Sequence, residues 1–333
     1  MNPSVAIIIL NWNGWSDTVE CLESVYQINY PNYHVVVVDN NSSNNSIQKI
    51  KEYADGNLEV KSKFFKYNSN NKPIKKSIYI NDEFKSNINL KYNKQLFILK
   101  NEINYGFAEG NNKGIKFVLN NLHSDYILLL NNDTVVDENF LTSLVFEAEK
   151  YEKVGLVGPK MYYYNNPDII WSIGGEIDWK FARGLHKGNN KLDKGQYEKK
   201  KKFDYINGTA VLIKREVIDK IGLLDKEFFL YFEEADLALR ASQVGYISQY
   251  IPHAKIWHKV SKSGGGISKP IGLYYITRNR WMFMNKWAKK SDYKVFIVSQ
   301  IIGAIIFPLI LSIYYRNSAL FRAYYSGLFD GIF

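Results

Sequence analysis

Apolar runs and amphipathic segments alternate along the first 135 residues of the chain. Two segments between the runs, residues 16–28 and 108–121, have helical spacing, and Ser16 or Asp17 can cap the first of them. The runs have the length and continuity of strands buried on both faces: VAIIIL (5–10), VVVVDN (35–40), QLFILK (95–100) and YILLLN (126–131). This order predicts an α/β fold with a mostly parallel sheet and right-handed crossovers.

A polar residue closely follows each predicted strand. Asn11, Asp39, Asn104 and Asp133 hold these positions. Asx turns and helix caps are ordinary explanations for any one of them. The carboxyl ends of parallel strands lie at one edge of a sheet, where α/β folds bind ligands, so the four residues together predict a polar binding site.

The segment 104–112, NYGFAEGNN, joins the third strand to a helix. Its glycines permit a ligand to approach the backbone closely, and the helix N-terminus offers N–H groups to phosphate. The segment lacks the GxGxxG pattern, which disfavours a dinucleotide-dependent dehydrogenase.

The most informative segment is residues 228–240, FFLYFEEADLALR. Glu233, Glu234 and Asp236 stand together where a helix begins, next to apolar positions that face a core. N-terminal capping by acids is the simplest explanation. Three carboxylates exceed what a cap needs, and buried carboxylates are costly unless they bind cations, hydrogen-bond to ligands or move protons. The segment therefore predicts a functional acid cluster.

The net charge of +10 is unevenly distributed. Residues 61–100 hold ten Lys against two acids, and residues 187–202 hold seven against two. Both stretches lack periodicity, so we expect surface loops, with 61–94 an insertion that contains a short hairpin around 78–90. Their lysines are either simply solvated or attract anionic lipid or a phosphate-bearing substrate. A nucleic-acid binder would instead gather basic and aromatic residues on one folded face, so that class is disfavoured.

Cysteine content and the N-terminus bear on the cellular compartment. The single cysteine, Cys21, excludes an intramolecular disulfide and a multi-cysteine zinc site. Neither a basic stretch nor a small-residue cleavage site accompanies VAIIIL, so we expect no secretory signal and a cytoplasmic-side location.

Residues 295–315 form an apolar, uncharged segment flanked by basic residues. About 20 such residues can span a bilayer. Pro308 and Gly303 weaken that interpretation, and the segment could instead lie in the membrane interface or pack as a buried hairpin. We expect residues 286–333 to form a membrane-associating helical region.

Seven motifs stand in the order typical of family 2 glycosyltransferases of the rhamnosyltransferase-like branch: NWNG, VVVDNNS, NYGFAEGNN, LLLNNDT, NGTAVLIKREV, YFEEADLALR and WH…SGG…YYITRNR. The chain resembles this family over residues 3–285, apart from the two Lys-rich stretches. The resemblance implies a GT-A fold, a Rossmann-like sheet with helices on both faces, and transfer with inversion. It also implies one domain over 1–285, with a nucleotide-binding half (1–135) and an acceptor-binding half (136–285).

The resemblance places the nucleotide sugar at the strand ends, with Asp39 at the base and ribose and two arginines at the diphosphate. The implied contacts are Asn11, Asn13, Asp39, Asn104, Gly106, Asn111, Asn132, Arg278 and Arg280. Asp133 matches the last acid of the family's DxD-type motif, and His258 would complete a site for Mn²⁺ or Mg²⁺. A helix cap at Asp133 and a packed aromatic cluster at Trp257-His258 are the alternatives.

The same resemblance implies the catalytic and acceptor residues. Glu234 stands at the second position of the family's Glu-Asp pair, usually the general base, although the family favours Asp there. Glu233 and Asp236 are therefore alternative bases. The implied acceptor side comprises Trp171, Gly174, Gly175, Asn207 and Gly208. Packing explains Trp171 as well as stacking on a sugar does.

The sequence thus predicts an inverting glycosyltransferase at the cytoplasmic face of the cell membrane, acting in polysaccharide biosynthesis for the cell envelope. It would move a sugar, with rhamnose favoured, from dTDP-rhamnose or a UDP-sugar to a hydroxyl of a lipid-linked or cell-surface glycan. A carboxylate would take the acceptor proton, and the divalent cation would offset charge on the leaving diphosphate. The alternative is a non-catalytic nucleotide- or glycan-binding protein on the same fold, and no nucleic-acid partner is expected.

Overall fold

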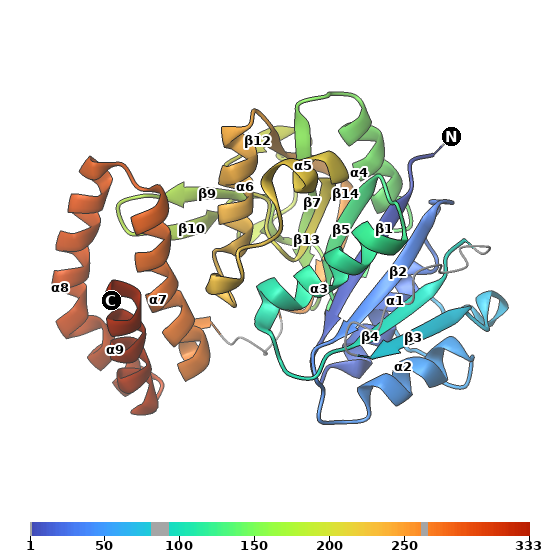
Figure 1. Ribbon diagram of the computed structural model, residues 1–333, viewed down its shortest axis with the longest axis horizontal. Coiled ribbons are helices and arrows are strands. Elements are labelled where there is room, and N and C mark those ends of the chain that lie inside the picture. Colours follow the sequence, from blue (N-terminus) through green and yellow to red (C-terminus); the bar gives the residue numbers. More distant parts are fainter. Residues whose placement is uncertain (1, 81–92, 261–265) are drawn as a thin grey trace.

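The computed structural model describes residues 2–80, 93–260 and 266–333, which form a sheet-centred α/β unit followed by three helices (Figure 1). The parallel part of the sheet has the order β5-β1-β2-β4-β3. Its strands are β1 (Val5–Asn11), β2 (Tyr33–Asp39), β3 (Lys76–Ile80), β4 (Leu96–Lys100) and β5 (Tyr126–Asn131). The predicted α/β class is confirmed, and so are the four predicted strands, to within two residues at each end.

The second half of the chain extends the sheet. β13 (Ala210–Lys214) lies antiparallel to both β5 and β7 (Val154–Tyr163). β14 (Ile247–His258) runs parallel to β7 and ends against β6 (Thr134–Val136). The remaining strands are marginal or form a separate β9–β10 ribbon: β8 (Ile169–Ser172), β9 (Gly175–Asp178), β10 (Arg183–His186), β11 (Lys191–Leu192) and β12 (Lys201–Phe203).

Helices cover both faces of the sheet because the central strands carry apolar side chains on both faces. Side chains of a strand point alternately to its two faces, so Ile7 and Ile8 of β1 enter different core clusters. One face packs against α1 (Trp15–Val25), α2 (Ser46–Ala54) and α4 (Phe140–Glu149). The other packs against α3 (Gly106–Asn121), α5 (Arg215–Ile221) and α6 (Glu233–Gln243). Short 3-10 turns are η1 (Ser69–Asn71), η2 (Lys226–Phe228) and η3 (Gly266–Ser268).

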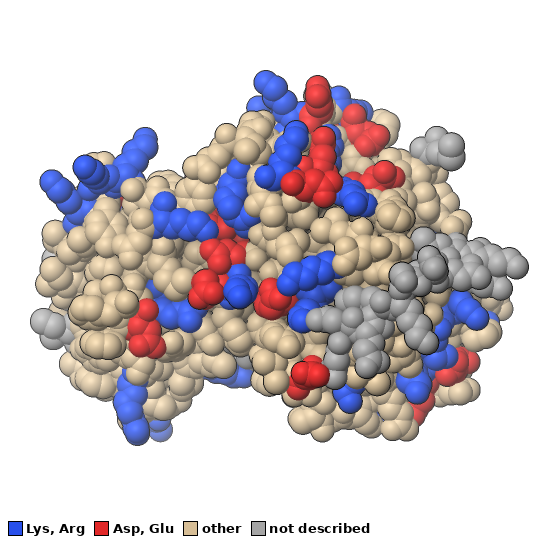
Figure 2. All heavy atoms as spheres, in the orientation of Figure 1, with Lys and Arg blue, Asp and Glu red and all other residues tan. Residues whose placement is uncertain are grey.

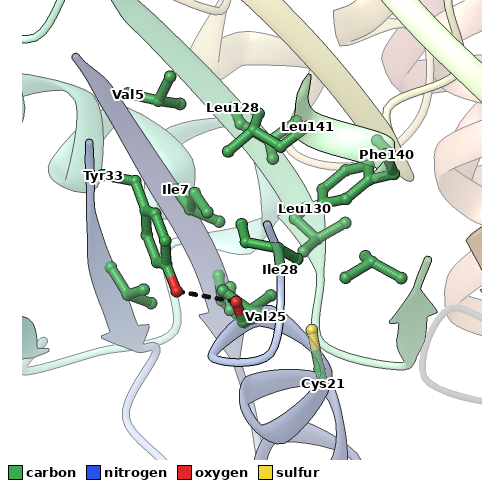
Figure 3. Close-up of a cluster of buried hydrophobic side chains, with 14 of the residues drawn as sticks. Val5, Ile7, Cys21, Val25, Ile28, Tyr33, Leu128, Leu130, Phe140 and Leu141 are labelled. Carbon is green, nitrogen blue, oxygen red and sulfur yellow. Dashed lines mark hydrogen bonds between the residues drawn. The ribbon is translucent and has the colours of Figure 1, made fainter. Parts of the chain in front are cut away.

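Figure 3 shows the first of these cores. Leu128 and Leu130 of β5 meet Phe140 and Leu141 of α4. The Tyr33 hydroxyl donates a hydrogen bond to the carbonyl oxygen of Val25, 2.9 Å away, which satisfies the polar end of an otherwise buried ring.

The Lys-rich stretch 61–94 is partly built into the fold, which corrects the expectation of a surface insertion. Residues 76–80 form β3, which pairs in parallel with β4, and Ile74 is buried in the first core. Lys72 is also buried, with its Nζ 2.8 Å from Oε2 of the buried Glu23. The predicted hairpin is not found over 78–80, and the rest of it lies outside the described residues.

Three helices form a layer beside the sheet: α7 (Pro270–Trp287), α8 (Lys290–Tyr314) and α9 (Ala319–Ile332) (Figure 1). α7 and α9 cross so closely that a Cβ on Gly327 would lie 2.4 Å from the carbonyl oxygen of Tyr274. A Cβ on Gly331 would lie 2.7 Å from the carbonyl oxygen of Arg278. The crossing therefore requires glycine at both positions.

The apolar segment 295–315 belongs to α8 and is not a buried hairpin, because Val298 and Ile301 are exposed. In the described part of the chain, no single helix has the length and apolar character to cross a membrane. Two halves of α8, Lys290–Ile301 and Ile306–Tyr314, meet that test of length and composition only together, across a bend of 55°.

Candidate active site

A hydrogen-bond network fixes the ends of β1 and β2 around Asp39. Asn11 and Asp39 are neighbours in register, both are buried, and Asn11 Nδ2 donates to Asp39 Oδ1 over 2.6 Å. Ser42 donates its backbone N–H (3.0 Å) and its hydroxyl (2.6 Å) to the same carboxylate. Asn13 has a φ of 55°, and its Oδ1 accepts the backbone N–H of Ser43. The network holds the carboxylate in one orientation at the strand end.

Asn40 ties the loop before α3 to β2. Its Nδ2 donates to Oδ1 of Asn104 (2.7 Å) and to the carbonyl oxygen of Gly106 (3.0 Å). Gly106 has a φ of 75°, and a Cβ there would lie 2.5 Å from the ring of Phe229. Asn40 stands directly after Asp39 in the motif VVVDNNS, but sequence reasoning did not predict that it holds the loop before α3.

Two predicted nucleotide contacts, Asn111 and Asn132, also hydrogen-bond within the protein. Asn111 is buried and donates to the carbonyl oxygen of Phe107 within α3 (2.9 Å). Asn132 donates to Oγ1 of Thr18 (3.0 Å). Both amides therefore support the backbone around the strand ends.

Asp133 and His258 come together because β14 ends beside β6, where His258 pairs in register with Thr134. His258 Nε2 lies 3.2 Å from Asp133 Oδ2, and both side chains are buried. Two adjacent ligands of an octahedral cation with bonds of about 2.1 Å lie roughly 3 Å apart, so the pair fits Mg²⁺ or Mn²⁺. No group of three His, Cys, Asp or Glu side chains suited to a metal occurs among the described residues. The chain would thus supply two ligands.

Glu233 and Glu234 form a close acid pair at the start of α6. Burial raises the pKa of both carboxyl groups, and the charge of Glu234 raises the pKa of Glu233 further. Oε2 of each group is buried, with no hydrogen-bond partner in the described chain. Neighbouring carboxyls withdrawn from water resist double ionisation and titrate as a pair. The pair therefore holds a proton at higher pH than ordinary carboxyl groups do.

Glu234 lines a cavity of about 240 Å³ together with His186, Tyr205 and Arg280. Trp171 connects this cavity to the Asp133–His258 pair, because its ring lies edge-on to both His186 (centroids 5.0 Å apart) and His258 (4.6 Å). Burial lowers the pKa of His186, and the nearby His258 lowers it further. The cavity that contains Glu234 and the candidate cation ligands are thus linked through the contacts of Trp171 with His186 and His258.

The predicted acceptor residues beside this cavity act mainly through the backbone. A Cβ on Gly174 would lie 2.3 Å from the ring of Phe203, and one on Gly175 would lie 2.0 Å from the ring of Tyr205. Asn207 accepts the backbone N–H of Thr209 (2.9 Å). Gly208 faces Glu234, with 3.7 Å between an added Cβ and the Cβ of Glu234.

Asp236 is separate from the acid pair. It is fully buried, and its Oδ2 accepts from Nε of Arg240 (2.8 Å). Its Oδ1 accepts from Nε1 of Trp287 (2.9 Å) and lies 2.7 Å from Nζ of Lys286. These contacts join α6 to α7 and occupy both carboxylate oxygens.

The loop that leads into the acid pair has a strained backbone held by Asn279. Positive φ values of 58°, 72° and 77° occur at three non-glycine residues: Phe229, Tyr231 and Phe232. Each such conformation costs about 1–3 kcal/mol. Nδ2 of the buried Asn279 lies 2.7, 2.8 and 3.0 Å from three carbonyl oxygens of this loop, those of Phe228, Leu230 and Tyr231. Sequence reasoning missed Asn279. The available signal was an amide side chain that stands between Arg278 and Arg280 in the sequence, on an otherwise apolar helix face.

The structure separates the two predicted diphosphate-binding arginines. Arg278 donates to the carbonyl oxygens of Glu227 and Phe228 and lies over the ring of Tyr275, 4.9 Å from its centroid. Arg280 is two residues further along α7 and therefore lies on nearly the opposite side of the helix. It lines the cavity that contains Glu234.

The sheet order and its antiparallel extension define a GT-A glycosyltransferase fold. The mannosyltransferase PcManGT of Pyrobaculum calidifontis, solved with GDP-Man and Mn²⁺, has a TM-score of 0.57 at 12% identity, covering 100% of this chain and 88% of its own. GalNAc-T7, solved with UDP, GalNAc and Mn²⁺, has a TM-score of 0.61 at 15% identity over 97% of this chain and 56% of its own. At these identities the likeness establishes the fold.

Residues 91–284 match the family described as Glycosyltransferase like family 2, and residues 6–73 match Glycosyl transferase family 2. The chain belongs to glycosyltransferase family 2, which confirms the resemblance carried by its motifs.

Similar curated proteins include rhamnosyltransferases. The dTDP-rhamnosyl transferase RfbF of Shigella flexneri is 24% identical over 196 residues, 55% of this chain and 61% of its own length. The N-acetylglucosaminyl-diphospho-decaprenol L-rhamnosyltransferase of Mycobacterium tuberculosis is 21% identical over 157 residues, 42% of this chain and 49% of its own. The hexosyltransferase Agl10 of low-salt glycan biosynthesis in Haloferax volcanii is 25% identical over 188 residues, 56% and 60%. The chain thus spans about half to three fifths of these relatives.

Proposed function

We propose that this protein is an inverting glycosyltransferase that moves a sugar from a nucleoside-diphosphate donor to a hydroxyl of a glycan acceptor. The observation that carries the proposal is the buried Glu233–Glu234 pair beside a cavity that can admit the acceptor. A general base is most effective when its pKa lies near the working pH, and burial shifts these carboxyl groups in that direction. Glu234 lines the cavity and acts as the base, and burial raises its proton affinity.

The geometry supports direct displacement. The acceptor hydroxyl loses its proton to Glu234 as its oxygen attacks the anomeric carbon, and the nucleoside diphosphate leaves from the opposite face. This path inverts the anomeric centre and needs no covalent intermediate. Asp133 and His258 would hold a divalent cation, which would supply positive charge beside the leaving diphosphate. Asp39 and Asn104 position the nucleotide at the strand ends.

The relatives bear on the donor and the setting. Two of them are named as rhamnosyltransferases, which favours dTDP-rhamnose as the donor, with a UDP-sugar as the second candidate. The name of the Mycobacterium tuberculosis relative includes a saccharide linked to a lipid through a diphosphate, N-acetylglucosaminyl-diphospho-decaprenol. This favours a lipid-linked or cell-surface glycan as the acceptor.

We place the enzyme on the cytoplasmic face of the cell membrane, bound through α8. Exposed Val298, Ile301 and Ile313 give this helix an apolar surface. Figure 2 shows basic side chains gathered over the turn from α7 to α8, beside a wide uncharged surface. Lysines near anionic lipid headgroups and apolar side chains in the interface together favour membrane binding.

The test is calorimetric titration of UDP and dTDP with and without Mn²⁺, paired with an assay of sugar transfer. Asp133→Asn should abolish the Mn²⁺-dependent gain in nucleotide affinity. Glu234→Gln should bind nucleotide normally and transfer sugar roughly 10²- to 10⁴-fold more slowly. Normal turnover by Glu234→Gln would contradict the assigned base, and folded wild-type protein that binds neither nucleotide would contradict the enzyme class.

A further inference from the structure

Two hollows flank the turn that joins β9 to β10. The cavity of Glu234 is also lined by Ala182 of this turn, by Arg183 at the start of β10 and by Arg280 of α7. A second, open groove of about 570 Å³ is lined by Phe181 of the same turn and by residues of α8 that include Val298. Because Phe181 and Ala182 are consecutive, the two hollows adjoin. The turn is anchored, since Ala182 packs in a buried cluster that includes Trp281, Met284 and Phe296.

The first hollow contains a part-buried arginine, Arg280, with unused hydrogen-bond donor capacity. Within the described chain, Arg280 makes no ion pair, and its buried Nε has no hydrogen-bond partner. Burial lowers the pKa of Arg280, and the neighbouring Arg183 lowers it further. The Nε of Arg183 already pairs with Asp178 (2.9 Å). A bound anion would satisfy the free donors of Arg280 and offset its repulsion from Arg183.

Phosphate is the anion that suits this place in an enzyme that acts on saccharides. Guanidinium groups form paired hydrogen bonds with phosphate oxygens. The donor diphosphate is the other candidate, but neither Asp133 nor His258 lines this cavity, whereas Glu234 does. The arginines therefore lie on the side from which the acceptor reaches the base.

The second hollow has the opposite character. Phe181, Val295 and Val298 are exposed apolar residues that border it, and they continue the apolar surface of α8. An acceptor whose phosphate lies between Arg183 and Arg280 would reach this groove directly across the β9–β10 turn. A hydrocarbon chain matches its lining.

We infer that the acceptor is a saccharide joined through a phosphate or diphosphate to a hydrocarbon chain, and that this chain holds it in two adjoining subsites. Arg280, with Arg183, binds the phosphate, and the groove between Phe181 and α8 binds the first part of the hydrocarbon. The inference rests on the proposed function and deepens it by naming how the acceptor is recognised.

Direct binding tests the inference without turnover. N-acetylglucosaminyl diphosphate esterified to farnesol would be titrated into the protein saturated with UDP or dTDP. The comparison ligands are the same sugar diphosphate without farnesyl and the uncharged octyl N-acetylglucosaminide. We expect the farnesyl compound to bind most tightly, with each comparison ligand roughly 10- to 100-fold weaker.

Three variants separate the subsites. Arg280→Gln should weaken both diphosphates roughly tenfold or more, yet leave octyl glycoside and nucleotide binding unchanged. Val298→Asp, at an exposed position, should weaken the two ligands that carry a hydrocarbon chain, the farnesyl compound and the octyl glycoside, and leave the diphosphate without farnesyl unchanged. Arg322→Gln, on the exposed surface of α9, is the matched control and should change nothing.

Other outcomes would overturn the inference or part of it. Equal affinity for the diphosphates with and without farnesyl would remove the hydrocarbon subsite. Weaker nucleotide binding by Arg280→Gln would assign this arginine to the donor. No binding of the farnesyl compound to protein that binds nucleotide would reject the acceptor subsites while the proposed transferase stands. Failure of the nucleotide itself to bind would instead reject the proposed function.

Discussion

Replacing Asn279 by Ala should slow the reaction without weakening the nucleotide site. Its amide nitrogen faces three loop carbonyl oxygens at 2.7–3.0 Å, and two hydrogens limit it to about two good hydrogen bonds at once. Each bond contributes about 0.5–1.5 kcal/mol, and a carbonyl left buried without a partner adds about 1–3 kcal/mol. We expect unfolding free energy to fall by about 2–4 kcal/mol.

The effect on rate follows from the strain in the loop. Three positive-φ residues store roughly 3–9 kcal/mol, which the released loop can relieve by moving. The loop runs directly into Glu233 and Glu234, so Glu234, the proposed base, moves with it. A displacement of about 1 Å costs on the order of 10²-fold in kcat.

The assay compares kcat, nucleotide affinity and thermal midpoint for Asn279→Ala and Asn285→Ala. Asn285 lies on the same helix but is exposed and makes one surface hydrogen bond with Tyr293. The control should keep near-normal kcat and stability. If Asn279→Ala remains folded and its kcat stays within threefold of wild type (about 0.7 kcal/mol), Asn279 does not position the acid pair.

Two further predictions concern buried charge. The pKa of Glu233 is raised in the folded protein, so its protonation stabilises the fold fully below the ordinary pKa of 4.5, and this stabilisation is lost as pH rises through the folded pKa. Glu233→Gln should therefore flatten the decline of the thermal midpoint on the alkaline side. An unchanged pH profile would contradict the argument that burial raises this pKa. Lys72→Met removes the cation from the buried Glu23 and should cost about 3–5 kcal/mol in urea unfolding. Lys49→Met, at a partly exposed pair with Glu52, should cost under about 1 kcal/mol. Equal losses would show that burial of the Lys72 pair does not matter.

Hydrophobic pattern was enough to predict the central sheet, because four uninterrupted apolar runs admit few other structures. It failed for β3, whose residues lie in a Lys-rich stretch where charge hides a short parallel edge strand. Lys72 looked like a solvated lysine until the fold brought Glu23 within 2.8 Å.

The candidate site was predictable only in part for a related reason. Acids at strand and helix ends are visible in the sequence, and Glu233 and Glu234 do share one place. The closeness of Asp133 and His258 depends on the register of β14 against β6, which no local pattern reveals. Asp236 resembled its neighbours in sequence, yet its partners Lys286 and Trp287 lie on another helix. Distant partners decide whether a carboxylate is structural or chemical.

α7 has a consequence for how the chain can be divided. A boundary at residue 285 cuts through this helix and removes Lys286 and Trp287, two of the groups that hold Asp236 of α6. Removal of α9 would also uncover the α7 surface at Tyr274 and Arg278, which Gly327 and Gly331 of α9 now cover, next to Asn279 and the loop that it holds. We therefore expect the C-terminal helices to stabilise the position of the proposed catalytic Glu233–Glu234 pair, and we expect any docking of α8 on a surface to alter that position.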